Sequence, residues 1–205
     1  MRYRGGVRII HRVAIAAAIV LTVASGASGA ATNPVHILFI GDSLTYGSVT
    51  SNIANAYPAR VTRSVHGQAS ILGKGGVVTS YWKPAALPTG IGVAVVELGT
   101  NDVYNHVAVA KFDRDYRHLL AAIHVKSPGV KFVCLSVWWP PGGFGAVPPY
   151  DERIQADCPG EYVDIAQFAH PPNLAARDHF HPNDAGHKLI ASVIIPAVRA
   201  TLAHG

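Results

Sequence analysis

The sequence predicts an α/β fold in which helices cover both faces of a parallel β-sheet. Three observations lead to this prediction. Short, almost wholly apolar runs recur along the chain, as in strands that are buried on both sides. Helix-like segments separate these runs, so that strand and helix alternate. No repeat or low-complexity tract follows the N-terminus, and 205 residues, 49% of them apolar, suit one domain.

Five short runs are the predicted strands. Residues 35–40 (VHILFI) are apolar except for His36 and are followed by Gly-Asp-Ser, which is typical of a buried strand that leads into a functional turn. The runs at 93–98 and 131–138 have the same apolar character, and weaker runs lie at 69–72 and 162–165. In open parallel sheets, ligands bind beyond the carboxyl ends of the strands. The residues that directly follow these runs are therefore the candidates for chemistry.

The strongest helix signal lies at residues 108–126, before Ser-Pro-Gly. Its apolar stripe consists of Phe112, Tyr116, Leu119, Leu120 and Ile123. A closing helix is predicted at 184–202, where we expect Pro196 to introduce a kink. Its inward-facing residues are Leu189, Ile190, Val193, Ile194 and Val198. Shorter helices are predicted at 57–65 and 151–157, with a Pro- and Gly-rich loop at 140–149.

The N-terminus has the pattern of a secretory signal peptide. A basic segment (MRYRGGVRIIHR) precedes an apolar stretch (VAIAAAIVLTVA) and then small residues, with a cleavage site expected near Ala30 or Ala31. The alternative is an uncleaved membrane anchor, but the apolar stretch is short for the roughly 20 residues that span a bilayer. We therefore assign residues 1–31 to a signal peptide and 32–205 to one domain, and expect a secreted protein without stable membrane insertion.

The basic balance of the chain comes mainly from this leader. The formal net charge is +5, and removing the charges of Arg2, Arg4, Arg8 and Arg12 leaves +1. A nearly neutral domain lacks the electrostatic signature of a nucleic-acid-binding protein. We expect a monomer with no nucleic-acid partner.

Two cysteines, Cys134 and Cys158, lie in the predicted domain. Export would place them in a compartment that permits disulfides. Cys134 lies within an apolar strand, however, so a buried free thiol is an equal alternative at this point.

Ser43 is the candidate nucleophile. It lies in Gly-Asp-Ser-Leu-Thr at the end of the first strand, where the free N–H groups of a helical turn would point toward a reacting oxygen. A serine hydroxyl needs a neighbouring base to become a good nucleophile. The alternative reading of the pentapeptide is an ordinary Asp-Ser helix cap.

The candidate base is His181, with Asp178 three residues before it in Asp-His-Phe-His-Pro. On a tight turn this spacing lets the carboxylate bind one ring nitrogen while the other faces the serine. The alternative is a polar loop before a helix that Asn183 caps.

Two further segments could stabilise an oxyanion. Asn101 follows the third strand in Gly-Thr-Asn-Asp, and a side-chain amide there could donate a hydrogen bond worth about 3 to 4 kcal/mol in a transition state. Turn formation is the competing role of this segment. The Gly-Lys-Gly-Gly turn at 73–76 allows close approach of a ligand to the backbone. Its spacing does not fit a phosphate-binding loop.

These four segments, in this order, resemble the four motif blocks of the SGNH (GDSL) hydrolase superfamily. The resemblance runs from Val35 to about Leu202. It implies a flavodoxin-like three-layer α/β/α sandwich with a five-stranded parallel sheet of order 2-1-3-4-5. It also implies a nucleophile at Ser43 and an Asp178–His181 pair that completes the triad. The implied oxyanion donors are the backbone N–H groups of Ser43 and Gly76 and the side chain of Asn101. No metal or organic cofactor is required.

Two positions depart from the pattern of the superfamily. The second block reads Gly75-Gly76-Val77, so either glycine could be the donor, and Gly76 is preferred. Histidines 179 and 187 flank the last block and are given no catalytic role, and His187 is expected to be structural. The G-x-S-x-G elbow of the α/β-hydrolases does not occur, which disfavours that fold.

The expected reaction is the hydrolysis of small-molecule or polysaccharide esters, with short acyl groups or O-acetylated carbohydrates preferred. Trp138, Trp139, Tyr46 and Phe144 are candidates to border the site or to pack in the core. A lipase or lysophospholipase is the first alternative, and acyl transfer to a sugar would use the same residues. A metal-dependent hydrolase built on Asp178, His179, His181, Asp184 and His187 is another, and a non-catalytic glycan-binding module is the last.

Overall fold

A computed structural model describes residues 33–142 and 145–203, and these form one compact unit that begins at Asn33. The predicted signal peptide at 1–31 lies outside the described residues. The sheet has five parallel strands in the order β2-β1-β3-β4-β5, as the resemblance implied. The strands are β1 (His36–Gly41), β2 (Gln68–Gly73), β3 (Val93–Glu97), β4 (Lys131–Leu135) and β5 (Glu161–Val163).

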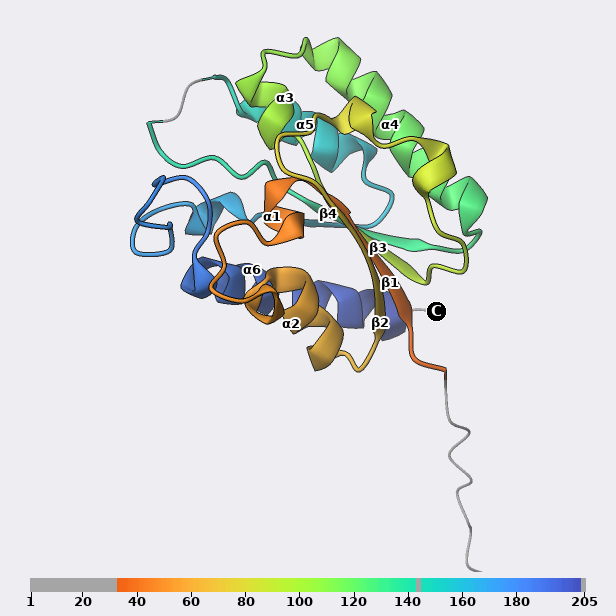
Figure 1. Cartoon of the computed structure of the whole chain (residues 1–205). Helices are drawn as coiled ribbons and strands as arrows, with labels where there is room; N and C mark the ends of the chain where they lie inside the picture. The colour runs from red at the N-terminus through yellow and green to blue at the C-terminus, as the bar shows by residue number, and fades with distance from the viewer. Residues whose placement is uncertain (1–32, 143–144, 204–205) are drawn as a thin grey trace, which may run out of the picture. The chain divides into compact units, whose positions relative to one another are not determined.

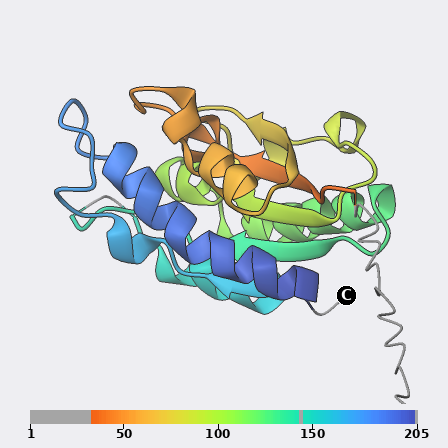
Figure 2. The ribbon, with the colours of Figure 1, turned by 90° about the horizontal axis from the view of Figure 1, so that it is seen from below.

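Helices cover both faces of this sheet and make three layers (Figure 1). α2 (Tyr57–Ser64) and α6 (Asp184–Ala203) lie on one face, and Figure 2 shows α6 running along the sheet on that side. α3 (Thr100–Tyr104), α4 (Val109–Lys126) and α5 (Pro148–Asp157) lie on the other face. The remaining short elements are α1 (Ser43–Tyr46) and the 3₁₀ turns η1 (Ile53–Asn55), η2 (Thr79–Tyr81), η3 (Pro84–Ala86) and η4 (Ala166–Phe168).

The residues of β1 explain why helices must cover both faces of the sheet. Ile37 and Phe39 are fully buried beneath α2 and α6, and Leu38 and Ile40 are fully buried beneath α4. Successive side chains of a strand point to opposite faces, so an unbroken apolar run supplies two cores at once. Burying each such side chain contributes about 1.5 to 3 kcal/mol. The fold class predicted from the sequence is therefore the observed one.

The helix predictions are confirmed most fully where the apolar stripe repeats over several turns. All five stripe residues of α4 are buried. In α6 the residues Ile190, Ile194 and Val198 are buried, and the helix continues through Pro196 to Ala203. Among the described helices, α6 alone has the length and hydropathy of a membrane span. Its apolar face instead packs into the core beside the sheet.

Some boundaries differ from the prediction for identifiable reasons. α5 begins at Pro148 rather than at residue 151, because prolines fit the first helical positions. β4 ends at Leu135, and residues 136–138 continue as irregular chain although Val137 and Trp138 remain fully buried. α1 and α3 were predicted only as turns, since helices of four and five residues are too short to show a period.

Cys134 and Cys158 form a disulfide, which settles the alternative that the sequence left open. The bridge joins β4 to the residue that follows α5, across a sequence separation of 24. In the chain-entropy model a loop of this length contributes about 3 kcal/mol to stability.

Candidate active site

Ser43 is the first residue of α1, at the carboxyl end of β1. Asp42 caps this helix, and its Oδ1 accepts a hydrogen bond from the N–H of Leu44 at 3.0 Å. The chain can turn so sharply because residue 41 is glycine: a Cβ there would collide with Thr45 Oγ1 and with the carbonyl oxygen of Glu97. Glycine at 41 therefore lets α1 fold back against β3.

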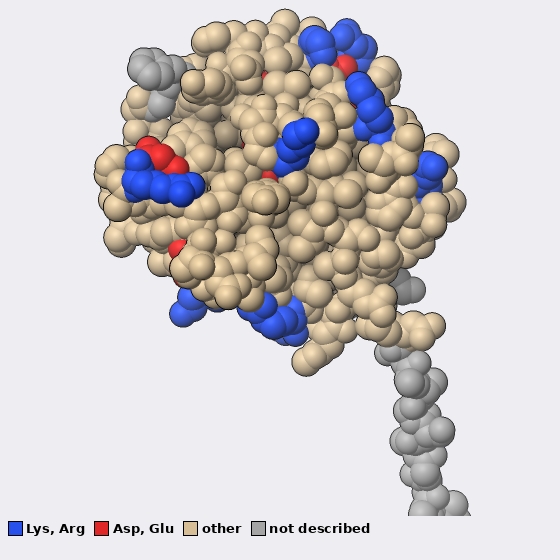
Figure 3. Space-filling view, in the orientation of Figure 1, with Lys and Arg blue, Asp and Glu red and all other residues tan. Residues whose placement is uncertain are grey.

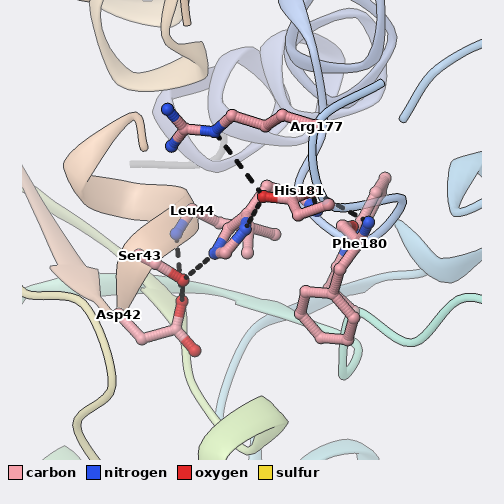
Figure 4. Close-up of polar contacts among 8 residues, drawn as sticks. Asp42, Ser43, Leu44, Arg177, Phe180 and His181 are labelled. Carbon is pink, nitrogen blue, oxygen red and sulfur yellow. Dashed lines mark hydrogen bonds and ion pairs between the residues drawn. The ribbon is translucent and has the colours of Figure 1, made fainter. Parts of the chain in front are cut away.

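The structure brings His181 to Ser43 (Figure 4), and Asp178 contacts His181 from the other side of the ring. The distance between His181 Nε2 and Ser43 Oγ is 3.0 Å, and that between His181 Nδ1 and Asp178 Oδ2 is 2.9 Å. The other oxygen, Asp178 Oδ1, accepts the backbone N–H groups of Phe180 and His181, each at 3.0 Å. One carboxylate thus stabilises its own turn and orients the imidazole.

The charge state of Asp178 follows from these contacts. Partial burial raises the pKa of the carboxyl, but the hydrogen bonds from Phe180 and His181 outweigh it, so that the pKa of Asp178 lies below its usual value. The side chain remains about 30% exposed. A permanently ionised carboxylate here can stabilise a positive charge on the neighbouring ring.

Ser43, Gly75, Gly76, Asn101 and His181 line one cavity of about 360 Å³. The amide of Asn101 donates through Nδ2 to Asp42 Oδ2 at 2.8 Å. An amide carries two N–H bonds, so the second can donate to a bound oxygen. All groups that the sequence proposed for oxyanion stabilisation therefore border the same space as the predicted nucleophile.

The structure does not distinguish between Gly75 and Gly76 as the oxyanion donor of the glycine turn. Gly76 has a left-handed backbone with φ of +76°, and a Cβ on Gly75 would lie 3.7 Å from the Cβ of Ser43. Both glycines therefore lie beside the predicted nucleophile.

A buried carboxylate holds the chain that follows the glycine turn. Asp102 is 1% exposed, and its Oδ2 accepts the N–H and the hydroxyl of Thr79, each at 2.9 Å. Burial raises the pKa of Asp102 to about 6. Sequence reasoning read this aspartate as part of a turn, and it instead ties η2 to α3.

A second pair of buried carboxyls, Asp42 and Glu97, lies behind Ser43. Both are fully buried. Glu97 Oε2 accepts the N–H of Asp42 at 3.3 Å and the hydroxyl of Thr45 at 3.0 Å, and Thr45 contacts Tyr57 OH at 2.7 Å. Burial and the nearby Asp42 raise the pKa of Glu97 well above its usual value. Burial also raises the pKa of Asp42.

Glu97 is the group that holds a proton in this pair. Its Oε1 has no hydrogen-bond partner among the described residues, so a negative charge there would be costly. Asp42 accepts hydrogen bonds from Leu44 and Asn101, which favour its ionised form. Glu97 could not be recognised from the sequence, because it lies inside an otherwise apolar strand.

The aromatic candidates divide between the core and the surface. Trp138 is fully buried and donates its Nε1–H to the carbonyl of Phe180 at 2.7 Å, so it braces the turn that carries His181. Trp139 packs edge-on against Phe180 with ring centroids 5.8 Å apart. Tyr46 is exposed outside the cavity, and Phe144 lies outside the described residues.

Phe180 and Tyr104 line the cavity, and sequence reasoning missed both. Phe180 is the residue between the two histidines of the Asp-His-Phe-His-Pro motif, and its ring packs edge-on against that of His181 at 5.4 Å between centroids. Its position inside a motif singled out for its polar residues was the only signal available.

Of the residues of the metal-site alternative, Asp178 and His181 are in contact, but Asp184 and His187 bind elsewhere. Asp184 binds Ser51 and Asn55, whereas His187 is buried and accepts the N–H of Tyr57 at 3.3 Å. Burial lowers the pKa of His187 to about 4, so the ring is neutral. Within the described ranges, no three His, Cys, Asp or Glu side chains form a group able to hold a metal ion.

The sheet order, together with the helices on both faces, defines a three-layer α/β/α fold of the SGNH hydrolase type, which is distinct from the α/β-hydrolase fold. Residues 39–189 match the model of the GDSL-like lipase/acylhydrolase family. The chain belongs to this family. Among curated proteins, none matches the sequence.

Solved structures of esterases share the fold at low sequence identity. A family two carbohydrate esterase from Clostridium thermocellum, in complex with cellohexaose, aligns with a TM-score of 0.63 and 20% identity over 85% of this chain and 67% of that chain. A two-domain esterase active on acetylated mannans, co-crystallised with mannopentaose, aligns with a TM-score of 0.62 and 20% identity over 82% and 50%. The psychrotrophic esterase EstA from Pseudoalteromonas sp. aligns with a TM-score of 0.62 and 17% identity over 82% and 98%.

The lengths covered differ among these structures. This chain spans about half to two thirds of the carbohydrate esterases that it matches, and nearly all of EstA. Likeness at this level of identity establishes the fold.

Proposed function

We propose that this protein is a secreted serine esterase that cleaves short-chain or O-acetyl esters through a Ser43–His181–Asp178 triad. The observation that carries the proposal is the chain of two hydrogen bonds, 3.0 Å and 2.9 Å long, that joins the hydroxyl to the imidazole and the imidazole to the carboxylate. Such a chain supplies what a weak serine nucleophile needs.

The reaction proceeds in two balanced halves. Ser43 Oγ attacks the ester carbonyl while His181 Nε2 takes its proton, and Asp178 stabilises the imidazolium. The tetrahedral intermediate collapses as His181 returns that proton to the departing alcohol, which leaves an acyl-serine. Water, deprotonated by His181, then attacks the acyl group and releases the acid and the free serine.

The developing oxyanion would be held by three donors. These are the backbone N–H groups of Ser43 and Gly76 and the side-chain amide of Asn101, which border the same cavity. Asp42 fixes the amide of Asn101 before substrate arrives, and such preorganisation lets a donor act at full strength in the transition state.

The size of the cavity supports the preference for small acyl groups. About 360 Å³ lies near the lower end of the ~300–1,000 Å³ of ligand pockets, and it must hold the reacting carbonyl as well. A long acyl chain would extend beyond this cavity.

The first test combines covalent labelling with an ester panel. We expect a fluorophosphonate to label the wild type and not Ser43→Ala, and Ser43→Ala to lose at least ~10³-fold in kcat on p-nitrophenyl acetate. Ser192→Ala, an exposed serine of α6, is the matched control and should retain activity. A fully active Ser43→Ala would end the triad proposal, and a strong preference for octanoyl or longer esters would favour a lipase.

Secretion is proposed on the leader pattern, and the Cys134–Cys158 disulfide supports it, because disulfides persist mainly in oxidising compartments. Expression of the full chain in a bacterial host should release a protein whose N-terminus lies near residue 31 or 32. An intact N-terminus in the membrane fraction would indicate an anchor instead.

A further inference from the structure

A second, larger hollow adjoins the cavity that contains Ser43. Its volume is about 820 Å³, and its walls include Gly76, Ser80, Tyr81, Trp82, Lys83 and Asn105. Gly76 belongs to both hollows, and the neighbouring residues Tyr104 and Asn105 at the end of α3 each line one of them. The two spaces therefore meet at the proposed oxyanion donor.

The walls of this hollow are fixed before any ligand binds. Trp82 donates its Nε1–H to the carbonyl of Gly41 at 3.2 Å. Lys74 Nζ lies 2.8 Å from Tyr81 OH and 4.5 Å from the centre of the Tyr81 ring. The bonds from Thr79 to Asp102 join η2, on one side of the hollow, to α3 on the other. A preformed groove of this kind loses little entropy on binding.

Aromatic rings beside the site are left partly open to solvent. Tyr81 is 43% exposed in the larger hollow, and Tyr104 is 66% exposed at the cavity of Ser43. Exposed rings beside a hollow are not accounted for by core packing, and they offer flat apolar faces to a ligand.

We propose that the larger hollow is a subsite for the sugar units of an O-acylated saccharide, with Tyr81 as its main platform. This inference rests on the proposed function, since it names the alcohol that the esterase releases. The smaller cavity must hold the acyl group and the reacting carbonyl, so the larger space is left for the alcohol.

The walls of the larger hollow are mainly apolar and carry a few polar side chains, and this combination suits a saccharide. The C–H face of a sugar ring packs on tyrosine, while its hydroxyls can bond to Lys83, Ser80 and Asn105. An alkyl chain would cover these polar groups without replacing their hydrogen bonds to water, which is unfavourable. Among the residues that line the hollow, Lys83 is the charged one, and Figure 3 shows a largely uncharged surface in this view, which suits a neutral ligand.

The solved structures with the same fold support the choice of a saccharide. Two of the esterases with the same fold were solved with cellohexaose or mannopentaose bound. Cello- and manno-oligosaccharides are therefore the probes for the test.

The experiment compares Tyr81→Ala with Tyr46→Ala on two kinds of substrate. Tyr46 is a matched control, because it is 59% exposed and lines neither hollow. We expect Tyr81→Ala to raise the KM for an acetylated cello- or manno-oligosaccharide about tenfold, as for one lost aromatic contact. Its kcat/KM on p-nitrophenyl acetate should stay within about twofold, and Tyr46→Ala should match the wild type on both.

Binding to the inactive enzyme makes the result independent of turnover. Calorimetry with Ser43→Ala should detect cellohexaose or mannopentaose, and Ser43→Ala/Tyr81→Ala should bind about tenfold more weakly. Circular dichroism checks folding, and Tyr81→Leu, which keeps bulk without the ring, should behave like Tyr81→Ala. If Tyr81→Ala lowers activity on both substrates equally, if it affects long acyl esters most, or if neither sugar binds, the subsite proposal is wrong. Loss of labelling at Ser43 would instead contradict the proposed function.

Discussion

Two carboxylate systems that are built in opposite ways lie near Ser43, one reached through His181 and the other in direct contact through Asp42. Asp178 lies on a solvent-exposed turn, and hydrogen bonds hold its pKa below the usual value. Asp42 and Glu97 are fully buried behind the serine, and burial raises the pKa of both. The exposed group is thus prepared to be charged, and Glu97 is prepared to be neutral.

The difference shows that the two carboxylate systems have separate roles, one electrostatic and the other positional. An ionised carboxylate near solvent can respond to a charge that appears on His181 during the reaction. A protonated carboxyl in the core can accept hydrogen bonds from Asp42 N–H and Thr45 without placing a second charge beside Asp42. Four predictions test this separation.

The largest effect is expected at Asp178. Asp178→Asn should lower kcat by about 10³-fold, because the neutral amide cannot stabilise the imidazolium or fix the ring tautomer. Its thermal stability should change little, since the side chain is partly exposed. Steady-state kinetics and a melting curve measure both. Retention of more than a tenth of the activity would show that the exposed carboxylate is not the partner of the base.

Substitution of Glu97 should affect stability more than catalysis, in contrast to substitution of Asp178. Glu97→Leu leaves the N–H of Asp42 and the hydroxyl of Thr45 without their acceptor, and each buried unsatisfied group costs about 1 to 3 kcal/mol. We expect a clear loss of stability and about a tenfold loss of kcat through displacement of Asp42 and Asn101, with KM nearly unchanged.

Glu97→Gln is the control for this variant. A glutamine keeps an acceptor oxygen and is neutral, as a protonated glutamate is. It should therefore restore most of the stability and activity that Glu97→Leu loses. If Glu97→Gln proves as damaging as Glu97→Leu, then Glu97 is charged in the folded protein and does not differ from Asp178 in charge state.

The pH dependence of stability should separate buried from exposed carboxyls. Asp102 has its pKa raised from 3.8 to about 6, so the folded state holds the proton more tightly and stability is lost as pH rises through this window. Relative to wild type, Asp102→Asn should become progressively more stable between pH 3.8 and about 6. Asp178 has a lowered pKa, so its contribution is present above 3.8 and is lost below it.

Denaturant unfolding at a series of pH values measures both differences. The curve for Asp102→Asn minus wild type should slope upward from pH 4 to 6 and be flat above. The curve for Asp178→Asn minus wild type should change only below about pH 4. Parallel curves for the two variants would mean that burial does not distinguish these carboxyls.

The features that could be predicted from the sequence are those with an apolar pattern or a polar motif, whereas the buried polar groups could not be predicted. The strands β1, β3 and β4 were predictable because burial on both faces leaves nearly continuous apolar runs, and α4 was predictable because its apolar stripe repeats over several turns. Ser43, Asn101, Asp178 and His181 could be proposed because polar motifs directly follow strands or precede a helix. The structure brings them to one cavity, and their catalytic roles remain proposals.

The supporting residues could not be predicted from the sequence. Glu97 is a single polar residue inside an apolar strand, and Asp102 sits in a segment that also suits a turn. Their roles depend on partners 52 to 55 and 23 residues away, respectively. Nothing local in the sequence specifies such contacts, since burial of a polar group becomes favourable only when the folded chain supplies its hydrogen bonds.

The smallest effect is expected at Arg177, the charged neighbour of Asp178. Its Nε lies 3.9 Å from Asp178 Oδ2, and its side chain is 70% exposed, whereas His181 Nδ1 approaches the same oxygen to 2.9 Å. Exposed ion pairs contribute about 0 to 1 kcal/mol and weaken with salt. Arg177→Ala should therefore change kcat by less than about threefold, and 0.5 M NaCl should reduce even that difference. A loss near that of Asp178→Asn would mean that the exposed carboxylate depends on a charged partner, and not on its backbone hydrogen bonds, to remain ionised.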